Sequence, residues 1–267
     1  MSFVGEAAHG AEQLGLFKPV EKFLDVARSG LPKVQAVSPK MLALSDRILE
    51  EGHDLIGKLR WRGNSGPDPR TGWRIGEINN RGHINDFARW IKGTGPELGP
   101  DSTCNCFEAL FVMAHRAHAV DKQALDRLHT KATAAAYISY RAEGDELGAK
   151  LAYWKVIEDY LAPGERTRFT IDPATGVGGP DIPAGHVVII DGMEHVMLSV
   201  GARDTLGRHL VLSHADYPEY SPAGPTTSKT FGFLQKTSVE EIVSVMKVRY
   251  PIDTSRIDSA LPTWLIG

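Results

Sequence analysis

Residues 186–214 read HVVIIDGMEHVMLSVGARDTLGRHLVLSH, and this stretch decides the class of fold that the sequence predicts. Three short segments in it alternate apolar and polar side chains, or are apolar throughout, as strands of a sheet do. Asp191-Gly192 predicts a two-residue hairpin between the first two segments. Gly201–Gly207 predicts a looser turn before the third. The expected antiparallel strands are His186–Ile190, Glu194–Val200 and Arg208–His214.

Helical patterns lie on both sides of these strands. Ahead of them, apolar residues recur every three or four positions across residues 18–60, with Ser38-Pro39 as a helix entry, and again from residue 106 to about 161, with a break near Gly144. Behind them, Ser238-Val-Glu-Glu241 has a capping-box pattern and opens a further helix, which we expect Pro251 to close. The order helix, antiparallel meander, helix predicts an α+β fold.

Two connecting regions are rich in turn-forming residues. Residues 63–100 are dominated by Gly, Pro, Asn and Asp, and predict an irregular connection with a short helix near residues 84–91. Residues 172–183 are dense in Gly and Pro and predict a loop ahead of the first strand.

Composition excludes several classes of function. The chain has 267 residues and a formal net charge of −3, so its charge does not favour nucleic acid or an anionic membrane as partner. No stretch approaches the roughly 20 apolar residues of a membrane-spanning helix, and the first residues lack the pattern of a secretory signal. Two cysteines one residue apart make neither a disulfide framework nor a zinc site, so we expect free thiols and no cofactor.

Both cysteines lie at the start of the second helical block, in the stretch Asp101–Phe111 (DSTCNCFEALF). Asn105 is a good N-cap, and Glu108 three residues later completes a capping box. Cys106 is then the first helical residue, where unpaired backbone N–H groups and the helix dipole favour a thiolate. Cys106 is the expected nucleophile and Cys104 the alternative. A buried, unreactive cysteine is the competing interpretation.

A reactive thiol needs a base, and two histidines of the strands are candidates. A hairpin centred between Asp204 and Thr205 would place His195 directly opposite His214 on one face of the sheet. One imidazole would then accept the thiol proton while the other orients it. A slip of one residue in this register would put His214 on the far face.

The remaining histidines fit the site less well. His115 and His118 lie too far along the helix from the sulfur, His209 falls on the opposite face of the strand, and His186 is a rim residue. A metal site built from His115, His118 and His129 lacks a supporting carboxylate, so no metal is expected.

The segments NCFEAL, IPAGHVVII with EHVMLSVG, and LVLSHA resemble the NlpC/P60 branch of the papain-like cysteine hydrolases. The resemblance implies a papain-like catalytic domain over residues 96–267 with a helical insertion at about 120–165, and leaves 1–95 as a helical extension. It implies Cys106 as nucleophile, His195 as base and His214 as third residue. The same order of residues also occurs in transglutaminase-like proteins and in glutamine deamidases, and in a transglutaminase-like version Asp216 is the third residue.

The resemblance also implies a substrate and a setting. NlpC/P60 enzymes mostly cut peptide or isopeptide bonds of bacterial cell-wall stem peptides. Because the chain shows no signal peptide, we expect an effector made in the cytoplasm and exported by a specialised secretion system, with the secretion machinery or an immunity protein as partner. The non-enzymatic alternative is a binding protein on the same fold, with the loops near Trp73 and Trp90 as its surface.

Overall fold

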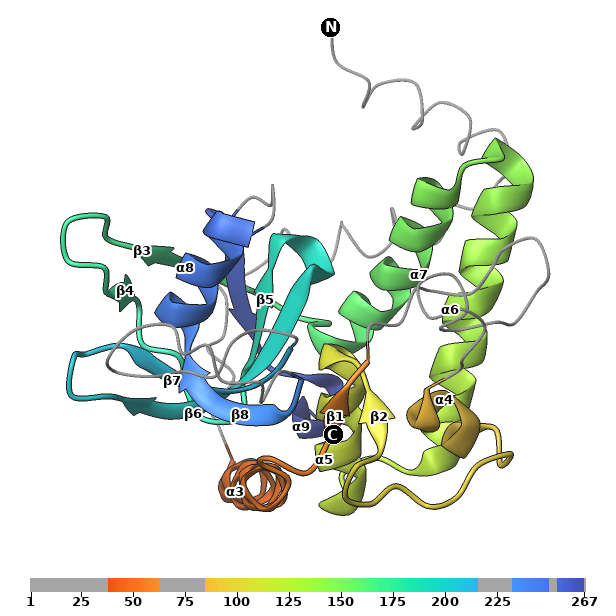
Figure 1. Ribbon diagram of the computed structural model, residues 1–267, viewed down its shortest axis with the longest axis horizontal. Coiled ribbons are helices and arrows are strands. Elements are labelled where there is room, and N and C mark those ends of the chain that lie inside the picture. The colour runs from red at the N-terminus through yellow and green to blue at the C-terminus, as the bar shows by residue number, and fades with distance from the viewer. Residues whose placement is uncertain (1–37, 63–84, 216–231, 250–253, 267) are drawn as a thin grey trace, which may run out of the picture. The chain divides into compact units, whose positions relative to one another are not determined.

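A computed structural model describes residues 38–62, 85–215, 232–249 and 254–266, and from Pro39 on these belong to one compact unit. Figure 1 shows its elements. The helices are α3 (Pro39–Asp54), α4 (Asp86–Ile91), α5 (Cys106–Arg116), α6 (Lys122–Glu143), α7 (Glu146–Leu161), α8 (Val239–Arg249) and α9 (Thr263–Ile266). The strands are β1 (Arg60–Trp61), β2 (Thr103–Cys104), β3 (Thr167–Ile171), β4 (Gly178–Gly179), β5 (Val187–Ile190), β6 (His195–Arg203), β7 (His209–His214), β8 (Leu234–Ser238) and β9 (Ile257–Ala260).

Within the described residues, the main sheet is antiparallel and has seven strands in the order β4-β3-β9-β5-β6-β7-β8. The three predicted strands are present as β5, β6 and β7, and the α+β class is confirmed. Four more strands flank them that the sequence pattern did not predict. These are short or mixed in polarity, as in β8 (LQKTS) and β9 (IDSA), so the period-two signal is weak in them. A separate parallel ladder pairs β1 with β2.

Each face of the main sheet has its own apolar core. On one face, Val196, Leu198 and Leu212 belong to the larger cluster, which includes α5 and parts of α6 and α7. On the other face, Met197 and Val211 belong to a smaller cluster that includes apolar residues of α8. Successive side chains of a strand point to opposite faces of the sheet. The cluster to which a residue of β6 or β7 belongs therefore shows on which face its side chain lies.

The predicted helices are largely confirmed. A helix starts at Pro39, a short one covers Asp86–Ile91, and the block after Cys106 is broken at Gly144, whose φ of 69° closes α6. The same block is also broken at 117–121, between α5 and α6, which the pattern did not predict. The helix opened by Ser238 is α8, whose Glu241 N–H donates to the Ser238 hydroxyl at 3.2 Å. The predictions for residues 18–37, 63–84 and Pro251 lie outside the described residues.

The first hairpin is longer than predicted. Ile190 pairs with His195, so four residues connect β5 to β6, and they include a short 3₁₀ turn, η1 (Asp191–Met193). The two-residue turn predicted at Asp191-Gly192 is therefore wrong. Because the connection is longer, β6 begins at His195, directly after the turn.

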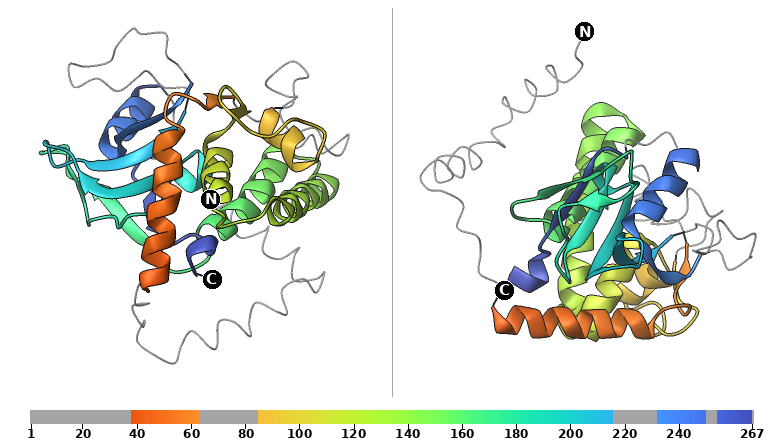
Figure 2. Two further views of the ribbon diagram at one scale, coloured as in Figure 1. Left: turned by 90° about the horizontal axis from the view of Figure 1, so that it is seen from below. Right: turned by 90° about the vertical axis from the view of Figure 1, so that its left-hand side faces the viewer.

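Helix α3 packs against both α5 and β7. A Cβ atom on Gly52 would lie 2.4 Å from Leu212 Cδ1 and 2.6 Å from Met113 Sδ, so the absence of a side chain allows this close approach. Figure 2 shows α3 in orange as one straight helix. Two pieces of the expected N-terminal extension, α3 and α4, thus belong to the same compact unit as the cysteine helix.

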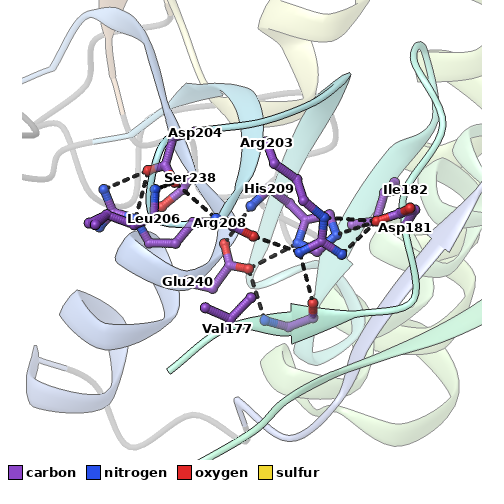
Figure 3. A network of polar contacts seen from close by, with 12 residues as sticks. Val177, Asp181, Ile182, Arg203, Asp204, Leu206, Arg208, His209, Ser238 and Glu240 are labelled. Carbon is purple, nitrogen blue, oxygen red and sulfur yellow. Dashed lines mark hydrogen bonds and ion pairs between the residues drawn. The ribbon is translucent and has the colours of Figure 1, made fainter. Parts of the chain in front are cut away.

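A network of polar contacts joins α8 to β4 and β7 (Figure 3). Glu240 of α8 accepts the His209 backbone N–H at 2.9 Å and the Gly178 N–H at 3.1 Å. Its second contact with His209, through Nδ1, is also 2.9 Å. Arg203 bonds Asp181 beside this group. The network therefore fixes His209 in a structural position, on the same face of β7 as Val211.

Candidate active site

The start of α5 has the capping arrangement that the sequence predicts. Asn105 is the N-cap, and its side-chain oxygen accepts the Glu108 N–H at 3.0 Å. The Glu108 carboxylate accepts the Asn105 N–H at 2.8 Å in return. These two bonds fix the backbone on both sides of Cys106, which is the first residue of the helix.

Glu108 also joins this helix start to that of α4. Its Oε2 accepts a hydrogen bond of 2.6 Å from Asn85 Nδ2, and Asn85 is itself the N-cap of α4. Glu108 has no exposed surface, and Asn85 is 1% exposed. A buried carboxylate therefore links the caps of two helices at the end of α5 that carries the cysteine.

The Cys106 sulfur lies against backbone N–H groups from two parts of the chain. The N–H groups of Val196 in β6 and of Phe107 in α5 both contact it, and both favour the thiolate. Cys106 is partly buried, however, and this burial, together with the charge of Glu108, raises the pKa of its thiol to about 11. The resting side chain is thus a neutral thiol at pH 7.

The register of β6 and β7 differs by one residue from the prediction. Met197 pairs with Ser213, and Leu198 pairs with Leu212. The direct pairing predicted for His195 with His214 is therefore wrong. Two features cause the difference. The turn is centred on Leu206, because Arg203 pairs with His209, and an irregularity between Ser199 and Arg203, where β6 has two more residues than β7, then shifts the pairing by two.

The irregularity contains Gly201, which has a φ of 73°. A Cβ atom there would lie 2.6 Å from the Ala184 backbone N, so both the conformation and the space require glycine. The Gly201–Gly207 segment thus turns the chain and also shifts the pairing of β6 with β7. This pairing determines which residues of β7 lie beside His195.

With this register, His195 contacts Ser213. His195 Nε2 lies 2.9 Å from Ser213 Oγ, and both residues are buried. Burial lowers the pKa of His195 to about 3, and the nearby His214 ring contributes to the same shift. His195 is therefore a neutral imidazole at pH 7, with one ring nitrogen oriented by a serine hydroxyl.

Cys106 and His195 approach β6 from opposite faces of the sheet. Cys106 packs against the larger cluster, to which Val196 belongs. His195 pairs with Ile190 and so shares its face, which is that of the smaller cluster. However, His195 is the first residue of β6, and the sulfur contacts the N–H of the residue that follows it. The two groups can therefore meet only around the start of the strand.

His214 faces a different set of groups. Its Nε2 donates to the Cys104 carbonyl oxygen at 3.1 Å. The backbone of Arg60 and of Phe233 also acts on the ring and raises its pKa, but burial dominates and lowers the value to about 4. His214 thus ties β7 to β2, the strand that leads into the cysteine helix.

His209 lies on the same face of the sheet as His195, because Val211 and Ile190 both belong to the smaller cluster. The prediction that His209 faces away from His195 is therefore wrong, and the register shift is again the cause. Its two bonds to Glu240 assign His209 to the polar network of Figure 3.

The other candidate residues lie apart from Cys106 or are buried. Cys104 is 1% exposed, and burial, with Glu108 second, raises the pKa of its thiol well above the usual value. His129 Nε2 contacts the hydroxyl of Tyr153 at 2.9 Å in the core. His115 Nδ1 lies 3.0 Å from the Val120 carbonyl oxygen. Within the described residues, no three His, Cys, Asp or Glu side chains gather as a metal site would require.

Ser213 is the contact that sequence reasoning missed. Serine is common in strands, and its position beside His195 depends on the register shift and not on any local pattern. Asp216, the other candidate for the third position, lies outside the described residues.

Comparisons with protein-family models, with curated proteins and with solved structures found no match to this chain. Among the helices that the structure describes, none is both long enough and apolar enough to cross a membrane.

Proposed function

We propose that this protein is a cysteine-dependent amide hydrolase in which Cys106 is the nucleophile, His195 the base and Ser213 the residue that orients the base. One observation carries the proposal: the Cys106 sulfur, at the start of α5, contacts the backbone N–H of Val196, the residue that follows His195. A nucleophile at a helix start and a base on the adjoining strand are the two parts that thiol hydrolysis needs.

Each of these residues has a separate role in the proposed reaction. The Cys106 sulfur attacks an amide carbonyl while its proton passes to His195, and the tetrahedral oxyanion accepts hydrogen bonds from N–H groups at the helix start. His195 then gives the proton to the departing amine, which leaves a thioester on Cys106. Water attacks this thioester as His195 accepts its proton, and the proton returns to the sulfur as the acid departs.

The charge state of the pair determines the timing of the first proton transfer. With a thiol pKa of about 11 and an imidazole pKa of about 3, both groups are neutral in the resting protein. The proton therefore leaves sulfur as the attack proceeds, and no stable thiolate–imidazolium pair forms beforehand. Because His195 Nε2 contacts Ser213, we expect the exchange to run through Nδ1, around the start of β6.

The proposed substrates are peptide or isopeptide bonds of cell-wall stem peptides, which the sequence resemblance suggests. With glutamine side chains as substrates the same chemistry deamidates, and with an amine in place of water it joins two proteins. The proposed setting is export by a specialised secretion system. Directing the protein to the bacterial periplasm should then harm the cells, and normal growth with confirmed expression would count against this setting.

A second candidate function is a binding protein with an unreactive Cys106. Two observations favour it: the raised pKa of the thiol, since nucleophilic cysteines usually have lowered values, and the approach of Cys106 and His195 from opposite faces of the sheet. Of the two tryptophans suggested for a binding surface, Trp90 is 1% exposed within α4 and Trp73 lies outside the described residues. The structure thus gives this candidate no exposed aromatic surface at Trp90.

Mass spectrometry after incubation with purified murein fragments, and separately with a glutamine-containing protein, tests the proposal. Hydrolysis would split stem peptides, and deamidation would add about one mass unit per glutamine. Cys106→Ala should abolish either product, while Cys104→Ala should retain it. No product from the intact protein on either substrate would favour the binding protein.

A further inference from the structure

Glu108 is a buried carboxylate close to the thiol, and the proposed reaction gives it no role. Its side chain lies in the first turn of α5, has no exposed surface and accepts the Asn105 N–H at 2.8 Å. Both cysteines are close enough for its charge to act on them. An anion here occupies the helix end at which a thiolate would be stabilised, so the two negative charges compete for one favourable position.

From this geometry we infer that Glu108 is a positioning residue with two opposed effects on Cys106: it fixes the helix start that presents the sulfur, and its charge adds to the effect of burial in keeping the sulfur protonated. The inference concerns the thiol of the proposed function, but its test requires no substrate. It gives the protein a thiol that is held in place yet is alkylated only slowly by iodoacetamide near neutral pH.

Glu108 and Cys106 lie in the same turn of α5, in a partly buried site, so their negative charges repel each other more strongly than they would in water. Removal of one charge should therefore lower the titration midpoint of the thiol by at least about one unit, which raises the thiolate fraction at pH 8 about tenfold.

Other ionisable groups around this end of α5 act in the same region. Tyr153 also senses the charge of Glu108, and its hydroxyl stays neutral because burial raises its pKa well above the usual value. Asp86 acts on Cys104. None of these groups accepts the backbone N–H of the N-cap residue Asn105, as Glu108 does. The surrounding groups are Cys104 from β2, Asp86 from α4, Tyr153 from α7, His195 from β6 and His214 from β7.

The variant that separates the two effects is Glu108→Gln. Glutamine keeps a carbonyl oxygen that can accept the Asn105 N–H and satisfies the N3 position of a capping box, but it carries no charge. The matched control is Glu240→Gln, which removes another buried carboxylate that accepts backbone N–H groups, on the opposite side of the sheet.

The measurement is the rate of iodoacetamide alkylation of Cys106 against pH, in a Cys104→Ala background that leaves one thiol. Fragment spectra of the two-cysteine protein check the assignment. The parent midpoint should lie near pH 11. Glu108→Gln should lower it by about one unit or more, and Glu240→Gln should leave it unchanged.

Two results would overturn the inference. One is an unchanged or higher midpoint in Glu108→Gln. The other is an equal fall in Asn105→Ala, which loosens the helix start but keeps the charge, because exposure of the sulfur would then explain the effect. A failure to hydrolyse any amide would refute the proposed function and leave this result as it stands.

Discussion

A difference of one residue in the pairing of β6 with β7 determines which side chain is the third residue of the proposed site. Had β6 and β7 paired as the turn at Asp204-Thr205 predicts, His214 would face His195. Instead the hydroxyl of Ser213 lies 2.9 Å from His195 Nε2, and His214 bonds the Cys104 carbonyl on the other side of the strand. A serine hydroxyl can orient an imidazole but carries no charge, so it stabilises an imidazolium less than a carboxylate would.

We predict that Ser213→Ala lowers the hydrolysis rate about tenfold, because the His195 ring loses an orienting contact. The unfolding free energy should fall by about 1 kcal/mol, as for other buried hydrogen bonds. Steady-state rates and urea unfolding of the same preparations check both values.

Ser199→Ala is the matched control for this substitution. Ser199 lies on the same face of the same strand pair, is equally buried, donates to the Ile182 carbonyl oxygen at 3.0 Å and accepts the Gly201 N–H at 3.1 Å. Its substitution should cost at least as much stability and leave hydrolysis unchanged. Equal losses of activity in the two variants would mean that Ser213 has only a structural role.

At the scale of elements, the start of α5 is the feature that presents the sulfur. We predict that Asn105→Ala lowers the unfolding free energy by about 1 kcal/mol, as loss of an N-cap does, and also slows hydrolysis because the first helical turn loosens. Asp145→Ala removes the cap of α7 and should cost similar stability with full activity. If both variants stay fully active, the cap does not position Cys106.

The capping box could be predicted from the sequence and the strand register could not, for a physical reason. Asn105 and Glu108 interact within one helical turn, so their spacing alone defines the motif. The register depends on a turn centred on Leu206 and on the irregularity around Gly201. At Gly201 a Cβ atom would collide with Ala184, seventeen positions earlier in the chain, and no local pattern encodes this. β8 and β9 could not be predicted for the same reason, because their few residues are ordered by pairing with neighbouring strands of the sheet.

At the scale of the whole molecule, three buried histidines make the fold sensitive to acid. Burial lowers the pKa of His129 and His195 to about 3 and that of His214 to about 4. In the unfolded chain each titrates near 6.5, so between these values the unfolded state binds more protons and stability falls as the pH falls.

We predict that the unfolding free energy is constant above about pH 7 and falls below about pH 6.5, by about 2 kcal/mol per buried histidine at pH 5. Urea unfolding at pH 7.5, 6 and 5 measures the loss. The pH dependence should weaken in His129→Gln, which removes one of the three groups. Unchanged stability from pH 7.5 to 5 would mean that these histidines are not buried as neutral rings.

The proposed role of His195 as the base for Cys106 is tested by the release of p-nitrophenol from p-nitrophenyl acetate, a substrate that any reactive thiol can attack. In the Cys104→Ala background we predict a burst of about one equivalent of p-nitrophenol per protein molecule, as an acyl-enzyme forms. The burst should be absent in Cys106→Ala and at least about a hundredfold slower in His195→Ala. A burst of unchanged rate in His195→Ala would contradict this role.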